Sequence, residues 1–164
     1  MGEDLCGLIC FCQKQHLLQV RGRDDLEKMQ QSNHDIQFIT EHVNCILAER
    51  SDVAAAYLLG SAVTGNLRDD SDIDIALLPV EEQDITLQSR LELTAQLEAK
   101  FNRTTDIGVI TAKNLIYASE AILKGYRIVT LQKDYTEAME TRLLGCYFTF
   151  RQDRKEVEES YSVA

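Results

Sequence analysis

The stretch from Tyr57 to Pro79 reads YLLGSAVTGNLRDDSDIDIALLP, and it contains a Gly-Ser pair followed at a fixed spacing by Asp-x-Asp. An apolar run, 53–59, ends at Gly60-Ser61, and a second apolar run carries Asp72 and Asp74. Side chains two residues apart on a β-strand point to the same face. We therefore expect Asp72 and Asp74 to project side by side, with the intervening Ile73 turned toward the core.

The two ends of this motif suit the chemistry of phosphates. Adjacent carboxylates repel each other, and hard divalent ions such as Mg²⁺ prefer such oxygen ligands and also hold substrate phosphates. Gly60 lets the backbone approach a phosphate, Ser61 offers a hydroxyl, and Gly65 keeps the loop small. The pattern predicts a site for phosphoryl or nucleotidyl transfer.

A third carboxylate supports this interpretation. Residues 104–110 read TTDIGVI, a further short strand in which Asp106 points away from Ile107 in the alternating pattern. Asp-x-Asp alone is common and Gly-Ser alone marks turns, but three strand-borne aspartates beside a Gly-Ser turn are hard to explain as surface solvation. Asp69 and Asp70 are interpreted as solvated turn residues.

Residues 60–75, GSAVTGNLRDDSDIDI, resemble the Gly-Ser-x10-Asp-x-Asp motif of the polymerase-β-like nucleotidyltransferase superfamily. The small size of the chain and its segments GYRIV (125–129) and GCYFTF (145–150) are similar to minimal members, the MNT-domain antitoxins that pair with HEPN ribonuclease toxins. The resemblance covers about residues 35–150. One departure is Thr64, where family members often carry arginine before the second glycine; Arg68 lies nearby in sequence.

The resemblance implies an α/β fold with a short mixed β-sheet flanked by helices. It also implies transfer of AMP from ATP to a tyrosine of a cognate HEPN toxin. Asp72, Asp74 and Asp106 would hold two Mg²⁺ ions, with Asp106 also able to take the proton of the acceptor. Gly60 and Ser61 would bind the β- and γ-phosphates.

Two alternatives stay open. Antibiotic-inactivating nucleotidyltransferases share the motif and modify a small hydroxylated molecule, although they usually carry an additional C-terminal helical domain. A non-catalytic antitoxin could instead neutralise its toxin by contact alone, but the three intact aspartates argue against a vestigial motif.

Composition limits the possible partners. The 164 residues suffice for one compact domain, and the net charge of −10 (27 acidic, 17 basic) disfavours sequence-independent nucleic-acid binding while allowing a basic protein partner. The five cysteines form no framework, and no apolar run is long enough to span a membrane. The first residues lack a basic leading region, so a cytoplasmic location is expected.

The chain divides into an N-terminal extension (1–30), a nucleotidyltransferase domain (31–152) and a charged tail (153–164). Cys6, Cys10, Cys12 and His16 match no usual zinc spacing.

Helices are expected from Ser32, from Asp84, over 114–124 and over 134–150, with strands at 53–59, 73–78, 104–110 and 126–131. We expect Gly125 to cap its helix in the left-handed conformation. Two apolar stripes are expected to face the core, one of Leu87, Leu91, Ala95 and Phe101, the other of Tyr135, Met139, Leu143, Tyr147 and Phe150.

Overall fold

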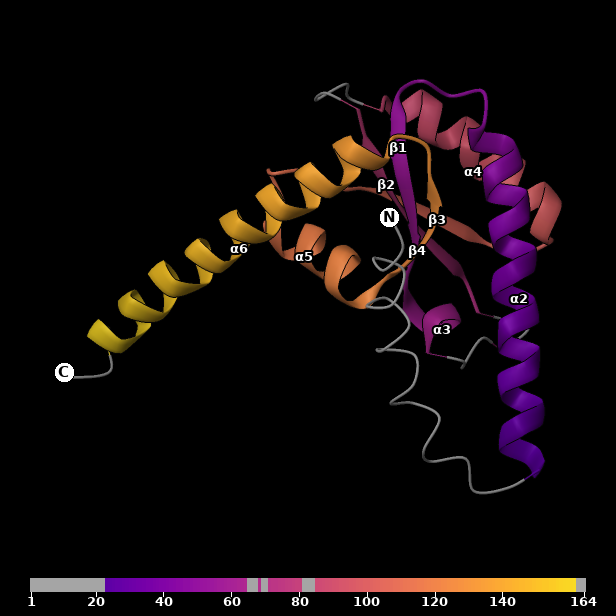
Figure 1. Ribbon diagram of the computed structural model, residues 1–164, viewed down its shortest axis with the longest axis horizontal. Helices are drawn as coiled ribbons and strands as arrows, with labels where there is room; N and C mark the ends of the chain where they lie inside the picture. The colour runs from indigo at the N-terminus through magenta and orange to yellow at the C-terminus, as the bar shows by residue number, and fades with distance from the viewer. Residues whose placement is uncertain (1–22, 65–67, 69–70, 81–84, 162–164) are drawn as a thin grey trace, which may run out of the picture.

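The computed structural model describes residues 23–64, 68, 71–80 and 85–161 (Figure 1). The proposed roles of Gly65, Asp69 and Asp70 therefore lie outside the described residues, as do the cysteines and histidine of the first 22 positions. None of the described helices has an apolar stretch long enough to cross a membrane.

A four-stranded mixed sheet forms the centre of the fold. Its strands are β1 (Val53–Leu58), β2 (Ile73–Pro79), β3 (Thr105–Val109) and β4 (Tyr126–Thr130), in the order β3-β2-β1-β4. β1 runs antiparallel to both of its neighbours, whereas β2 and β3 are parallel. The expected α/β fold with a short mixed sheet is confirmed.

Helices cover both faces of the sheet and divide the core into two clusters (Figure 1). On one face lie α2 (Arg23–Leu47) and α4 (Leu87–Phe101); on the other lie α5 (Leu115–Lys124) and α6 (Lys133–Tyr161). The short helix α3 (Gly60–Val63) directly follows β1. In β2, odd-numbered residues such as Ile73 and Ile75 pack toward α2 and α4, while even-numbered residues such as Ala76 and Leu78 pack toward α5 and α6.

The helix boundaries differ from the expected ones at both ends of the chain. α2 begins at Arg23, well before the expected start at Ser32. Its apolar residues at helical spacing face the sheet: Ile39, Val43 and Leu47 are buried, and Ile36 and Ile46 are partly buried beside them. α6 continues to Tyr161, well past the expected end at residue 150.

The two expected apolar stripes are only partly buried. In α4 the core side chains are Leu93, Leu97 and Phe101, whereas Leu87 and Leu91 are 66% and 61% exposed. The prediction for this helix face was wrong because the apolar residues lie all around the helix, and only packing selects the buried side. In α6, Leu143 is buried, but Phe150 and the residues at 151–155, 157 and 158 are exposed, because this part of the helix projects from the sheet (Figure 1).

Gly125 ends α5 in an extended conformation, with φ of −74°, and the predicted left-handed cap is wrong. Glycine is needed at this position because a side chain would not fit. A Cβ here would lie 2.3 Å from the Ala121 carbonyl oxygen and 2.6 Å from Leu59 Cδ2. The left-handed cap of the fold is instead Asn102, which ends α4 with φ of 52° and donates its backbone N–H to the Glu98 carbonyl oxygen.

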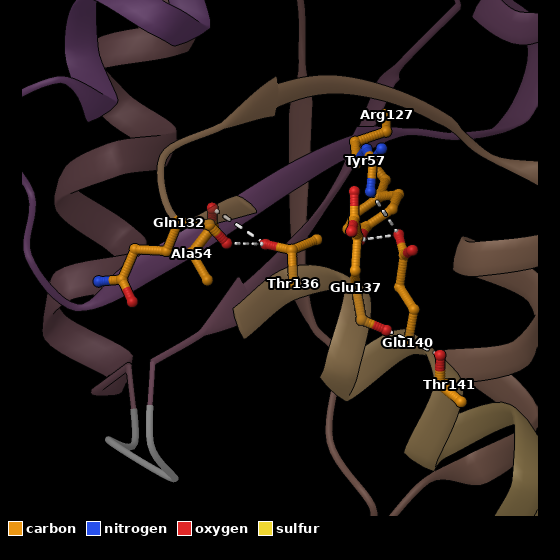
Figure 2. Close-up of polar contacts among 8 residues, drawn as sticks. All are labelled: Ala54, Tyr57, Arg127, Gln132, Thr136, Glu137, Glu140 and Thr141. Atoms are coloured by element: carbon orange, nitrogen blue, oxygen red, sulfur yellow. Dashed lines mark hydrogen bonds and ion pairs between the residues drawn. The ribbon is translucent and has the colours of Figure 1, made fainter. Parts of the chain in front are cut away.

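A polar network joins α6 to the sheet (Figure 2). The buried Tyr57 hydroxyl donates to Glu140 Oε1 at 2.6 Å, and Arg127 Nη1 donates to the same oxygen at 3.1 Å. Burial and the Glu140 carboxylate raise the pKa of Tyr57 well above its ordinary value. One turn earlier, the fully buried Thr136 hydroxyl lies 2.7 Å from the Gln132 carbonyl oxygen and 3.5 Å from the Ala54 carbonyl oxygen of β1. These contacts hold the first turns of α6 against β1 and β4.

Candidate active site

Asp72 and Asp106 both lie near Asp74, where β2 and β3 begin. Asp74 and Asp106 are direct partners in the parallel register of β2 and β3, so their side chains emerge side by side from the same face. Asp72 precedes β2 by one residue and is exposed, as is Asp106, whereas Asp74 is half-buried. The alternation expected from the sequence is present, since Ile73, Ile75 and Ile107 are buried on the opposite face.

Gly60 lies against this group, at the end of β1. The backbone N–H of Leu59 donates to the Asp74 carbonyl oxygen at 2.9 Å, which holds the two segments together. Gly60 has a φ of +65°, and a Cβ at this position would lie 2.2 Å from Asp74 Oδ2. Both the backbone conformation and the lack of space therefore require glycine.

α3 begins at Gly60, and Ser61 is its second residue. No side chain caps its first turn, which leaves the backbone N–H groups at the start of α3 available to an anion. The Thr64 hydroxyl donates to the Ser61 carbonyl oxygen at 3.2 Å, so it closes the end of α3. Beyond it, the backbone carbonyl of Arg68 accepts from Arg103 Nη1 at 2.8 Å.

The electrostatics of the group are dominated by negative charge. Partial burial raises the pKa of Asp74, and the nearby Asp106 and Asp72 carboxylates raise it further. These three groups are close enough to repel one another, which is the environment that a hard cation relieves.

The donor set of carboxylate oxygens suits Mg²⁺. Within the described residues, however, no three acidic, histidine or cysteine side chains are arranged to hold a metal ion as they stand. Asp72 and Asp106 are exposed, so both side chains can rotate toward Asp74 without disturbing the core.

Tyr117, which the sequence did not single out, lies beside the carboxylates. It comes from α5 and packs over Gly108, two residues after Asp106 on the same face of β3. Burial and the charges of Asp106 and Asp74 raise the pKa of Tyr117 to about 12. The signal available in the sequence was Gly108 itself, because a glycine inside a short strand often marks a close approach by another group.

A family model described as polymerase beta, nucleotidyltransferase matches residues 41–134, more than half of the chain. The chain belongs to this family. The matched segment runs from α2 to the start of α6, so it includes the Gly60–Ser61 turn, the three aspartates and Tyr117. No curated protein is significantly similar to this nucleotidyltransferase in sequence.

Solved structures share the fold of this nucleotidyltransferase. A chain of a toxin–antitoxin crystal structure with AMP-PNP is 20% identical, with a TM-score of 0.62 over 75% of this chain and 98% of that one. A chain of the toxin–antitoxin MntA–HepT is 19% identical, with a TM-score of 0.58 over 77% and 98%. A third, from a tri-AMPylated Shewanella oneidensis HEPN toxin in complex with MNT antitoxin, is 19% identical, with a TM-score of 0.59 over 77% and 98%.

Proposed function

We propose that this protein is an antitoxin-type nucleotidyltransferase that transfers AMP from ATP to a tyrosine of a HEPN ribonuclease toxin. The observation that carries the proposal is the pairing of Asp74 with Asp106 in register, directly beside the close approach of Gly60. Such a group of carboxylates next to an uncapped helix start suits a triphosphate accompanied by divalent cations. Membership of the nucleotidyltransferase family supports the reaction class.

Different residues act on the leaving side and on the attacking side of the α-phosphate. On one side, the backbone at Gly60 and the Ser61 hydroxyl bind the β- and γ-phosphates, which leave as pyrophosphate. On the other side, Asp106 accepts the proton of the attacking hydroxyl. Asp72, Asp74 and Asp106 would hold two Mg²⁺ ions, which would neutralise the phosphate charge and lower the pKa of the attacking hydroxyl.

Two observations favour a protein tyrosine as the acceptor. One structural neighbour belongs to a complex whose HEPN toxin is tri-AMPylated. The net charge of −10 also suits a partner with a basic surface, because opposite charges speed the encounter of two proteins. Each transferred AMP adds a phosphodiester charge to the toxin, and this charge repels RNA phosphate.

The direct test is co-expression with a HEPN-type protein encoded beside this one, followed by intact-mass measurement and peptide mapping of that protein. We expect an adenylyl mass increment on a tyrosine that depends on ATP and Mg²⁺. The double variant Asp72→Asn/Asp74→Asn should abolish the increment yet melt at or above the wild-type temperature, because it removes repulsion between carboxylates. Asp153→Asn, an exposed carboxylate on α6, serves as the matched control and should retain activity.

Two outcomes would replace the proposal. If the partner stays unmodified with ATP and Mg²⁺ present, yet is neutralised by the double variant, the protein is a binding antitoxin. If a small hydroxylated antibiotic accepts AMP and the partner does not, the protein is a small-molecule nucleotidyltransferase.

A further inference from the structure

We propose that Tyr117 is a substrate-binding residue of this site, whose hydroxyl donates a hydrogen bond to a non-bridging oxygen of the phosphoryl group under transfer. The inference rests on the proposed function, since it assigns a further contact within the same reaction.

The position of the hydroxyl depends on the absence of a side chain at Gly108. A Cβ built on Gly108 would lie 1.9 Å from the Tyr117 hydroxyl oxygen and 2.5 Å from its Cζ. The register partner of Gly108 on β2 is Ala76, which is fully buried. Two adjacent small residues therefore leave a depression in the sheet face, and the end of the Tyr117 side chain fills it.

This depression adjoins the aspartates on the side away from Gly60. In the sheet, β1 leads into the Gly60–Ser61 turn, β2 carries Asp74, and β3 carries Asp106 and then Gly108 at the edge. In phosphoryl-group chemistry the attacking and leaving oxygens lie roughly in line on opposite sides of the phosphorus. With pyrophosphate held near Gly60, Tyr117 lies on the side from which the acceptor enters.

The Tyr117 hydroxyl is a donor without a bound acceptor among the described residues. Tyr57, which lies on the same face of the sheet, donates to Glu140 at 2.6 Å. The Tyr117 oxygen is not among the buried atoms of the described residues that lack a partner, so it stays accessible to water and to a ligand. The nearby Asp106 and Asp74 charges and burial keep the pKa of Tyr117 near 12, so the hydroxyl keeps its proton at neutral pH. A neutral donor beside three carboxylates is suited to an anionic phosphoryl oxygen, which the carboxylates themselves would repel.

The first test compares Tyr117→Phe with Tyr57→Phe, since each removes one hydroxyl and keeps its ring. For Tyr117→Phe we expect kcat to fall by about 100-fold, the lower end of the loss that follows removal of one donor to a transition state. The dissociation constant of a non-hydrolysable ATP analogue, measured with Mg²⁺ present, should rise by about three- to tenfold, as expected for the loss of one hydrogen bond. The melting temperature should stay unchanged. Tyr57→Phe should show the reverse pattern, with a lower melting temperature and wild-type kcat.

A second pair of variants separates the hydroxyl from the packing. Gly108→Ala must displace Tyr117, so it should reduce kcat at least as much as Tyr117→Phe does and also lower the melting temperature. Adding Tyr117→Ala to Gly108→Ala removes the clash and should restore most of the melting temperature while kcat stays low. Recovery of wild-type kcat in this double variant would overturn the assignment.

Two further results decide against the inference. Wild-type kcat and analogue affinity in Tyr117→Phe would show that the hydroxyl contacts no substrate. An adenylyl group found on Tyr117 itself, by peptide mapping after incubation with ATP and Mg²⁺, would make it an acceptor and not a binding residue. If the wild-type protein modifies no acceptor at all, the proposed function fails, while the analogue-binding comparison still decides the role of Tyr117.

Discussion

The Asp74 carboxylate occupies the space that any side chain at position 60 would need, with its Oδ2 atom 2.2 Å from where a Cβ on Gly60 would lie. The glycine of the Gly-Ser pair and the second aspartate of Asp-x-Asp are therefore a single packing unit. Their spacing in the sequence is the length of chain needed to leave β1 and return along β2.

Gly60→Ala tests this unit. The left-handed conformation at position 60 costs an alanine about 1–2 kcal/mol, and the new methyl group also pushes the Asp74 carboxylate from its place. We expect AMP transfer to fall by at least about tenfold, because displacement of a ligand by 1 Å can have an effect of that order or larger. The variant should also melt at a lower temperature, measured by calorimetry.

Gly145→Ala is the matched control for that experiment. Gly145 is an exposed residue in the middle of α6, and nothing lies within 4 Å of a Cβ at this position. Alanine is favoured over glycine in a helix by about 0.5–1 kcal/mol, so this variant should be slightly more stable and fully active. A comparable loss of activity in both variants would remove the special role of position 60.

Asp74→Asn should stabilise the metal-free protein at neutral pH. The folded protein holds a proton on Asp74 more tightly than the unfolded chain, so ionisation favours unfolding as the pH rises through the ordinary value of 3.8. Because Asp74 is partly solvated, we expect a melting temperature only about 1–3 °C above wild type at pH 7 in EDTA. The melting temperatures of the wild type and of Asp74→Asn should converge below pH 3.8. A constant difference across the whole range would mean that the carboxylate charge is not the cause.

Glu140→Ala should destabilise the attachment of α6 more than Tyr57→Phe does. Tyr57→Phe removes one hydrogen bond, worth about 0.5–1.5 kcal/mol, whereas Glu140→Ala leaves both Tyr57 and Arg127 without their partner and should cost about 1.5–3 kcal/mol. Urea denaturation measures both. Since the pKa of Tyr57 is raised in the folded state, wild-type stability should fall above pH 10, and Tyr57→Phe should reduce that fall. An identical alkaline loss in both proteins would contradict the assignment.

Gly125→Ala should destabilise the junction between α5 and β4. A methyl group here meets the Ala121 carbonyl and the Leu59 side chain, and overpacking of this kind typically costs about 1–3 kcal/mol. Since φ is negative at Gly125, the cost arises from sterics alone. Combining Gly125→Ala with Leu59→Ala removes one of the two obstacles, and the two effects should therefore be less than additive in chemical denaturation.

The sequence alone determined the α/β fold, all four strands and the faces of β2 and β3 on which Asp74 and Asp106 lie. Alternation along a strand decides which side chains share a face, and this local geometry needs no knowledge of distant residues. Ile39, Val43 and Leu47 of α2 recur at helical spacing, so the face that they share is also a local pattern. The family resemblance rested on the same local motif.

Only the tertiary structure decided the rest. Leu87 and Leu93 are equally apolar, and which of them is buried depends on where the sheet lies beneath α4. Gly60 adopts a positive φ, whereas Gly125 has an ordinary negative φ and avoids collisions with Ala121 in its own helix and with the distant Leu59. The position of Tyr117 over Gly108 likewise arises where α5 crosses the sheet. Local patterns fix which way a side chain points, but the neighbour that it meets depends on contacts between elements that the chain brings together only when it folds.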